Sequence, residues 1–202
     1  MRPALSVLAV SLALAAPSFA QKVTEPKTGE SFENTDKDGW WLLGTGVRTR
    51  TMLNVKVYAI GLYIDGPSYT RLVSSKGGNV RPSPELYKEL VWGDFGKRFD
   101  LRFVRDLSAA QIQGAFREAL PGANKARVDQ FVTYFGDLAK GQGAVIRWAP
   151  GGTLETTVAG AAKPPIADKD FAAAVFSIWL GDKPIQADIK RDLVSRTAVM
   201  VN

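Results

Sequence analysis

Apolar and polar side chains alternate along several short stretches of the chain, which is typical of strands with one buried face. In residues 97–105, three large apolar side chains lie at every second position, with charged side chains between them. Residues 40–50 and 52–64 are rich in β-branched and aromatic residues and predict two neighbouring strands joined by a turn. Two shorter strands are expected at residues 144–148 and 153–158, around a Pro-Gly-Gly turn.

Helical spacing occurs in the segments between these strands. Between residues 128 and 138, apolar side chains recur at intervals of three and four, which predicts an amphipathic helix. Ser108 and Gln111 have the spacing of a capping box, and Asp168 and Gly181 suit the two ends of an apolar helix between them. We therefore predict helices at residues 84–92, 108–120, 128–138, 169–180 and 185–194.

Strands and helices follow one another in pairs and do not alternate strictly. That order predicts an α+β fold with an antiparallel sheet and argues against a doubly wound parallel one. Residues 21–39 are polar and mixed, so we expect an irregular entry segment before a single domain at residues 40–202. Gly61 within a predicted strand indicates a bulge or a close approach of another group to the backbone.

The first 20 residues have the pattern of a cleavable secretory signal peptide. A basic residue at position 2 precedes an apolar run from Leu5 to Ala16, and small residues at positions 18 and 20 predict a cut near Ala20. The run is shorter than the roughly 20 residues that cross a membrane. We expect a periplasmic or secreted protein with no transmembrane segment. The alternatives are an N-terminal anchor and a buried helix.

The sequence has no His and no Cys, which excludes several kinds of site. Ser-His-Asp and Cys-His nucleophiles and His/Cys zinc sites cannot form. The acidic residues lack the spacing of a calcium loop, and Gly44-Thr45-Gly46 lacks the third glycine of a dinucleotide site. We therefore expect no metal and no cofactor, and any acid–base chemistry would fall to Tyr, Lys, Asp or Glu.

The formal net charge is +6, but the basic residues are spread along the chain without a dense basic and aromatic run. We therefore expect no nucleic-acid partner. A modest positive field favours small anions or the anionic surface of an envelope, although most of these side chains are equally consistent with a solvated surface. The sequence leaves the oligomeric state open, with a monomer favoured.

Arg48 is the residue that most directly suggests a binding site. It lies in an apolar, glycine-flanked segment, and a buried cation on a core-facing strand position needs an anionic partner. A guanidinium fits a carboxylate or a phenolate through two parallel hydrogen bonds. Arg50, on the same face, strengthens the argument for an anion between them. Alternatively, Arg48 points to solvent or pairs with an internal acid such as Asp100.

Five motifs, in order, resemble those of the chalcone isomerase-like family, and of its bacterial members in particular. They cover approximately residues 40–195 and are the segments 44–48 (GTGVR), 56–64 (KVYAIGLYI), 101–108 (LRFVRDLS), 170–181 (DFAAAVFSIWLG) and 182–193, which contains Asp-Lys-Pro and Lys-Arg-Asp-Leu. The resemblance implies a large antiparallel sheet with helices layered on one face and a ligand cleft between the two layers.

The resemblance also implies which residues would line that cleft. In the plant isomerases, an Arg steers the substrate phenolate as it adds across its own enone, and Thr and Tyr hydroxyls polarise the ketone. Arg48 falls on the Arg position and Tyr58 on a Thr position. The positions of the catalytic Tyr, an Asn and a second Thr fall on Ile112, Ala119 and Ile178. Most of the polar groups of the isomerase reaction are therefore replaced.

The fatty-acid-binding relatives in this family use the same cleft, where the Arg and a Tyr hold a carboxylate. We therefore predict an exported, non-catalytic protein that binds a small amphipathic carboxylate through Arg48, Tyr58, Ile112, Ile178 and Trp179. One alternative is an intramolecular lyase of the chalcone isomerase type with an altered site, in which Arg48 and Tyr58 are catalytic. The other is an envelope interaction protein whose cleft is filled.

Overall fold

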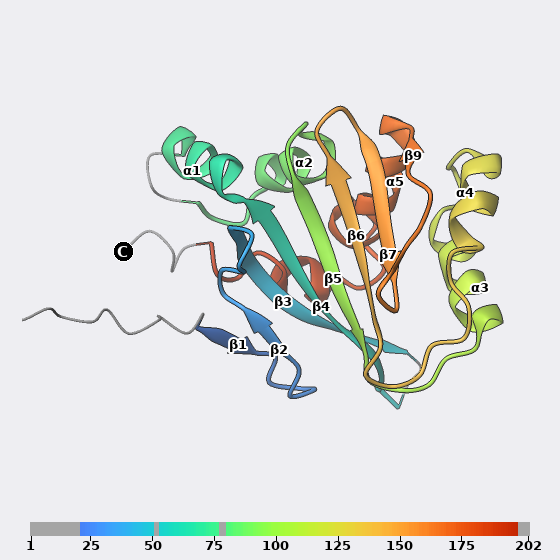
Figure 1. The fold of residues 1–202 in the computed structure, drawn as a ribbon. Helices are drawn as coiled ribbons and strands as arrows, with labels where there is room; N and C mark the ends of the chain where they lie inside the picture. The colour runs from blue at the N-terminus through green and yellow to red at the C-terminus, as the bar shows by residue number, and fades with distance from the viewer. Residues whose placement is uncertain (1–20, 51–52, 77–79, 198–202) are drawn as a thin grey trace, which may run out of the picture.

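The fold is a large, open antiparallel sheet with helices packed on one of its faces (Figure 1). The structure is a computed structural model that describes residues 21–50, 53–76 and 80–197. The predicted signal peptide lies outside these described residues. The fold class predicted from the sequence is confirmed.

The main sheet has seven strands in the order β3-β4-β5-β6-β7-β8, and β9 pairs with β7. The strands are β3 (Trp40–Arg50), β4 (Val55–Asp65), β5 (Lys97–Phe103), β6 (Gly143–Ala149), β7 (Thr153–Val158), β8 (Ala161–Ala162) and β9 (Ile166–Ala167). The helices are α1 (Gly66–Ser75), α2 (Pro84–Trp92), α3 (Ala109–Ala119), α4 (Lys125–Val132), α5 (Lys169–Leu180) and α6 (Ala187–Asp192).

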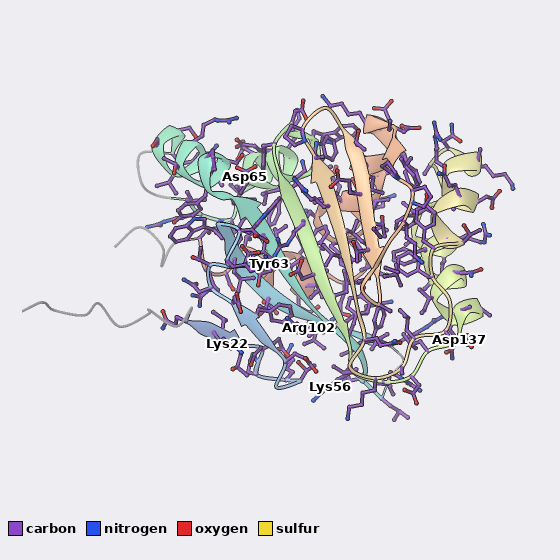
Figure 2. All side chains as sticks on the ribbon, viewed as in Figure 1. Lys22, Lys56, Tyr63, Asp65, Arg102 and Asp137 are labelled. Carbon is purple, nitrogen blue, oxygen red and sulfur yellow. The ribbon has the colours of Figure 1, made fainter. Side chains whose placement is uncertain are left out.

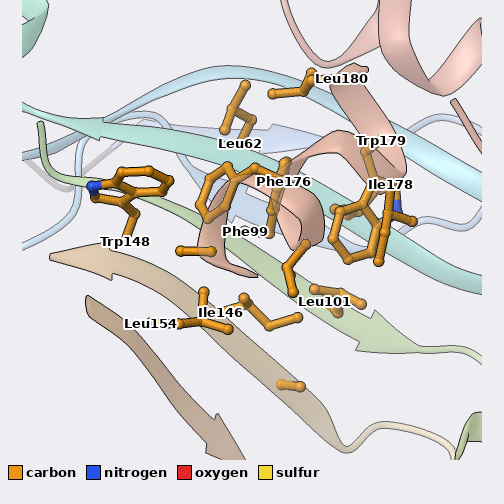
Figure 3. Close-up of a cluster of buried hydrophobic side chains, with 14 of the residues drawn as sticks. Leu62, Phe99, Leu101, Ile146, Trp148, Leu154, Phe176, Ile178, Trp179 and Leu180 are labelled. Atoms are coloured by element: carbon orange, nitrogen blue, oxygen red, sulfur yellow. The ribbon is translucent and has the colours of Figure 1, made fainter. Parts of the chain in front are cut away.

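The main hydrophobic core lies between the sheet and the helices. The apolar positions of β5 that alternate in the sequence all face this layer and are nearly or fully buried. Figure 3 shows Phe99 of β5 against Phe176 and Trp179 of α5, and the ring centroids are 4.8 and 4.7 Å apart. Burial of these aromatic side chains is the main force that holds α5 on the sheet.

A short hairpin covers part of the opposite face of the sheet. We expected residues 21–39 to be irregular, but they contain β1 (Lys22–Thr24) and β2 (Ser31–Glu33), which pair with each other. Phe32 packs on β4 at Gly61, where an added Cβ would lie 2.8 Å from the Phe32 ring. Gly61 therefore serves a close approach, and the register of β4 stays regular around it.

Two further elements differ from the sequence predictions. Helix α1 was not predicted, because Gly66 and Pro67 were interpreted as the end of a strand. Asp65 caps this helix by accepting a hydrogen bond from Ser68 N, and Pro67 occupies its first turn. The helix predicted at residues 128–138 ends as α4 at Val132, although Phe135 and Leu138 remain buried in the core.

Strand β3 forms one edge of the sheet, and groups from outside the sheet cover it. Leu42 N donates a hydrogen bond to Asn34 O at 3.0 Å, and Arg196 N donates to Leu43 O at 2.9 Å. Further along, the side chain of Gln186 hydrogen-bonds the backbone at Val47 and Thr49. These contacts occupy backbone groups that an exposed edge would offer to another strand.

None of the helices in the described ranges is both long enough and apolar enough to cross a membrane.

Candidate functional site

Arg48 and Tyr58 lie directly opposite each other on the paired strands β3 and β4. Residues opposite each other in an antiparallel pair share a face of the sheet. Tyr58 belongs to the core on the helix-covered side, so Arg48 faces the helices too. The register shifts between Arg48 and Thr49, so this pair is the last before a bulge. The structure therefore brings together the two polar residues predicted for the site.

Two glycines of β3 allow the C-terminal segment to lie directly on the strand. A Cβ added at Gly44 would lie 2.3 Å from Asp192 O, and one added at Gly46 would lie 3.4 Å from Ile189 Cα. Any larger side chain at Gly44 would push α6 away from the sheet. The Gly-Thr-Gly motif thus sets the distance between β3 and the segment that contacts Arg48.

The guanidinium of Arg48 is half-buried and contacts neutral oxygens. Its Nη1 donates hydrogen bonds to Ile185 O at 3.2 Å and to Gln186 Oε1 at 3.3 Å. Across the described ranges, no carboxylate lies within ion-pair distance of Arg48, so its charge has no anionic partner among these residues.

The alternative pairing of Arg48 with Asp100 is wrong. Asp100 pairs with Gly61, so it lies on the other face of the sheet, where it binds Arg98 at 2.9 Å. Arg98 also contacts Asp36 at 2.6 Å. Both carboxylates of this network bind Arg98 and are not available to Arg48.

Gln186 connects the guanidinium to the edge of the sheet. Its Oε1 accepts hydrogen bonds from Arg48 and from Thr49 N, the latter at 3.0 Å. Its Nε2 donates to Val47 O at 3.3 Å. Gln186 was not predicted as a site residue, because no local pattern links it to a strand 137 residues earlier in the chain.

Tyr58 presents a protonated hydroxyl beside this cation. Trp179 Nε1 donates a hydrogen bond to the Tyr58 oxygen at 2.9 Å. Burial raises the pKa of Tyr58 to about 12, against the opposing effects of the Trp179 hydrogen bond and the Arg48 charge. An indole N–H can only donate, so the Tyr58 oxygen is the acceptor and its own hydrogen is left for another group. Within the described residues, that hydrogen has no acceptor.

The three apolar residues predicted for the site are all part of the packed core. Ile112, Ile178 and Trp179 are each at most 5% exposed. Figure 3 shows Ile178 and Trp179 side by side near the end of α5. Trp179 forms a hydrogen bond with Tyr58, one member of the polar pair. Ile112 and Ile178 pack against other residues of the hydrophobic core.

Arg48 and Tyr58 do not line either of two hollows in the described surface. One, of about 540 Å³, lies between the end of α2, the α3–α4 connection and α5, and its lining includes Trp92, Ala119 and Ser177. The other, of about 460 Å³, lies beside the start of α3. Next to Arg48, the core side chains of Tyr58 and Trp179 are at most 9% exposed, so the site is packed on this side. Its closest link to a hollow is through α5, where Ser177 lines the larger one and Trp179 contacts Tyr58.

Acidic residues do not gather into a metal site. Within the part of the chain that the structure describes, no three His, Cys, Asp or Glu side chains are close enough together to hold a metal ion.

Comparison with known proteins identifies similar chains. A family model described as chalcone isomerase-like matches residues 21–195. Fatty-acid-binding protein 1 of Arabidopsis thaliana is 25% identical over 88% of this chain and 71% of its own. Chalcone isomerase-like protein 1 of Humulus lupulus is 29% identical over 78% of this chain and 82% of its own. A chalcone–flavanone isomerase of Phaseolus vulgaris is 25% identical over 91% of this chain and 90% of its own.

A solved structure has the same fold. The crystal structure of a fatty-acid binding protein from Arabidopsis thaliana superimposes with a TM-score of 0.77 and 22% sequence identity, over 90% of this chain and 99% of that one. This likeness establishes the fold, and the residues of the site must carry the argument about function.

Proposed function

Because the chain belongs to the chalcone isomerase-like family, we propose that it binds a small amphipathic carboxylate, such as a fatty acid, without catalysing a reaction. The observation that carries the proposal is the pair of donors at Arg48 and Tyr58. A half-buried guanidinium bound to neutral oxygens lies beside a hydroxyl whose hydrogen has no acceptor in the described residues. A carboxylate would satisfy both groups.

Two relatives support this ligand class. The Arabidopsis proteins named fatty-acid-binding protein 1 and 2 are each 25% identical to the chain over 88% and 87% of its length. Their names say what those proteins bind, and the polar pair described above is chemically suited to the same kind of head group.

The bound carboxylate would take the place of neutral oxygens. It would displace Gln186 Oε1 and Ile185 O from Arg48 and accept the Tyr58 hydrogen. The exchange replaces hydrogen bonds from the guanidinium to neutral oxygens by a bidentate ion pair, in which the opposite charges also attract each other. The alkyl chain would lie against Ile112, Ile178 and Trp179, which must move apart because this region is packed. Binding therefore selects a more open arrangement of α3 and α5.

The same observations weigh against the isomerase alternative. The positions on which the resemblance places a catalytic Tyr and Thr hold Ile112 and Ile178, which offer no hydroxyl. The raised pKa of Tyr58 makes it a poor base near neutral pH. The interaction-protein alternative expects a filled cleft, and the burial of Ile112, Ile178 and Trp179 agrees with it. That alternative does not account for a half-buried Arg48 that hydrogen-bonds neutral oxygens.

We also propose that the protein is exported, and works in the periplasm or outside the cell as a monomer. The supporting observation is the signal-peptide pattern of residues 1–20, with a cut near Ala20. Mass spectrometry of the N-terminus of protein recovered from its native host tests this. A mature chain beginning at Gln21 supports export, and an intact N-terminus contradicts it.

The ligand proposal is tested with variants of Arg48 and Gln186, which form a hydrogen bond with each other at the site. We expect Arg48→Ala to lower the affinity for dodecanoate and hexadecanoate by roughly 10- to 100-fold, because the charge-assisted hydrogen bonds are lost. Gln186→Glu should lower it to a similar extent by placing a carboxylate of the protein on Arg48. Titration calorimetry on the chain beginning at Gln21 measures both effects, and native mass spectrometry identifies anions retained through purification.

The expectation that Arg50 shares a face with Arg48 is wrong, because the bulge after Arg48 pairs Arg50 with Val55, which lies on the opposite face from Tyr58. Arg50→Ala is therefore the matched control, since it removes the same charge from an exposed residue outside the site. It should leave the affinity within about twofold. Equal losses in Arg48→Ala and Arg50→Ala would contradict a specific site. The absence of any affinity for either fatty acid in the wild type would overturn the proposal.

A further inference from the structure

The end of the sheet where β3 turns into β4 carries an exposed apolar side chain between basic ones. Leu53 is 85% exposed, more than any other large apolar side chain in the described part of the chain. Arg50 and Lys56, on either side of the turn, are also exposed. Figure 2 shows Lys56 at this end of the molecule, far from Asp65 at the other end of β4.

Two neighbouring loops add positive charge at the same end. Val104 N donates a hydrogen bond to Val57 O at 3.1 Å, which brings the exposed Arg105 beside the start of β4. The exposed Lys140 lies in the loop before β6, where its backbone N–H donates to Asp106 Oδ1 at 2.7 Å.

The negative charge near this surface is smaller. Asp106 and Asp137 are the exposed acids of these loops, and each accepts a hydrogen bond from a backbone N–H. Arg50, Lys56, Arg105 and Lys140 form no ion pair with any residue that the structure describes, although the Lys56 ammonium does contact Lys27 O. We call Leu53 and these four basic residues the tip surface.

We propose that the tip surface docks on an anionic lipid surface. An exposed apolar side chain that can enter the boundary between head groups and acyl chains, at the same end of the molecule as several basic residues, is a combination that such surfaces attract. Phosphate-bearing lipid head groups complement the four basic side chains, and a neutral protein partner would not.

Docking through the tip surface would serve transfer of the ligand, an inference that rests on the proposed function. Arg48 is two residues from Arg50 along β3, so the candidate site lies close to the tip surface. A water-insoluble carboxylate could pass from the lipid to Arg48 over a short path. Docking itself does not depend on the identity of the ligand and can be measured separately.

The test is sedimentation of the chain beginning at Gln21, which contains every helix and strand described above, with lipid vesicles. The wild type should bind vesicles of equal parts phosphatidylglycerol and phosphatidylcholine, and not vesicles of phosphatidylcholine alone. Leu53→Asp combined with Arg105→Glu should lower this partitioning by more than about twentyfold, since each basic residue near such a surface contributes roughly fivefold.

Lys88→Glu combined with Trp92→Asp is the matched control, because it makes the same changes on the exposed surface of α2. It should bind the anionic vesicles as the wild type does. Equal losses in the two double variants, equal binding to both kinds of vesicle, or no binding of the wild type would each overturn the proposal.

The outcome is distinguishable from a failure of the proposed function. Leu53→Asp/Arg105→Glu should keep its affinity for dodecanoate in solution, because neither residue contacts Arg48. Gln186→Glu should lose that affinity but still bind anionic vesicles. A tip-surface variant that lost fatty-acid affinity would contradict the separation of the two sites.

Discussion

Lys97 is a cation buried completely within the core. Its Nζ donates hydrogen bonds to Val91 O at 3.2 Å and Gly93 O at 2.7 Å, at the C-terminal end of α2. It also lies 4.0 Å from the centre of the Trp148 ring. Carbonyls at a helix end and an aromatic face both favour a positive charge. Burial nevertheless lowers the pKa of Lys97 to about 7.

This burial predicts an unusual pH dependence. Between pH 7 and about 10, the unfolded chain binds a proton at Lys97 that the folded chain releases, so the free energy of unfolding should rise with pH. The rise is at most about 1.4 kcal/mol per pH unit. Above pH 10 it should reverse, because burial raises the pKa of Tyr58 in the folded state. Urea unfolding at several pH values measures the slope.

Lys97→Met is the control, since methionine fills a similar volume without a charge. Its free energy of unfolding should lack the rise between pH 7 and 10. A wild type and variant with parallel pH profiles would show that Lys97 does not titrate in this range.

The hydrogen bond between Trp179 and Tyr58 makes a second prediction at this scale. Tyr58→Phe leaves the buried indole N–H without its partner and should cost about 1–3 kcal/mol of stability. With Trp179→Phe added, the further loss should be smaller than Trp179→Phe causes alone, with a coupling of about 0.5–1.5 kcal/mol. Urea unfolding of the four proteins gives the coupling.

Tyr63 provides a control cycle, because its hydroxyl donates to Glu33 O on the opposite face of the sheet. Tyr63→Phe and Trp179→Phe should be additive within about 0.5 kcal/mol. Equal coupling energies in the two double-mutant cycles would mean that the coupling between Tyr58 and Trp179 reflects a general loosening of the core.

Among the elements, α6 depends most directly on the bare backbone of β3. Gly44→Ala would place a Cβ 2.3 Å from Asp192 O, and a backbone carbonyl cannot move aside as a flexible side chain can. We expect a loss of about 1–3 kcal/mol or more, with α6 displaced from the strand. Fatty-acid affinity should change as well, because the segment that contacts Arg48 leads into α6.

Gly114→Ala in α3 is the matched control, as nothing lies within 4 Å of its added Cβ. It should stabilise the protein by about 0.5–1 kcal/mol, because alanine favours helix. Urea unfolding compares the two. A Gly44→Ala protein as stable as the wild type would show that the contact with α6 yields easily.

The elements also show where sequence patterns succeed. The long strands and α5 were predicted because burial imposes a period of two or a continuous apolar run over many residues. Strands β1, β2, β8 and β9 have only two or three residues, too few for any period to be seen. Helix α1 was missed because its capping signal, Asp65 with Pro67, is also a signal for a turn.

At the scale of the whole molecule, the two faces of the sheet differ in kind. One is covered by helices and an aromatic core, and the other carries the Arg98 network under the β1–β2 hairpin. The resemblance to the chalcone isomerase-like family implied one site for Arg48 and Tyr58, and the register of β3 and β4 places these two residues opposite each other. Contacts between distant segments, such as Gln186 with Thr49, follow from the assembled fold and leave no local pattern.

The covered edge of β3 affects how the protein behaves at high concentrations of identical chains. A sheet ending in a bare strand can recruit identical chains into fibres, and crowding makes this more severe. Here, the backbone groups of Asn34 and Arg196 and the side-chain amide of Gln186 occupy the positions where a recruited strand would form hydrogen bonds. If an anion replaces Gln186 as the partner of Arg48, the side chain of Gln186 remains hydrogen-bonded to β3 through Thr49 N. If the protein binds a carboxylate as proposed, it can bind and release this ligand while the edge of β3 stays covered.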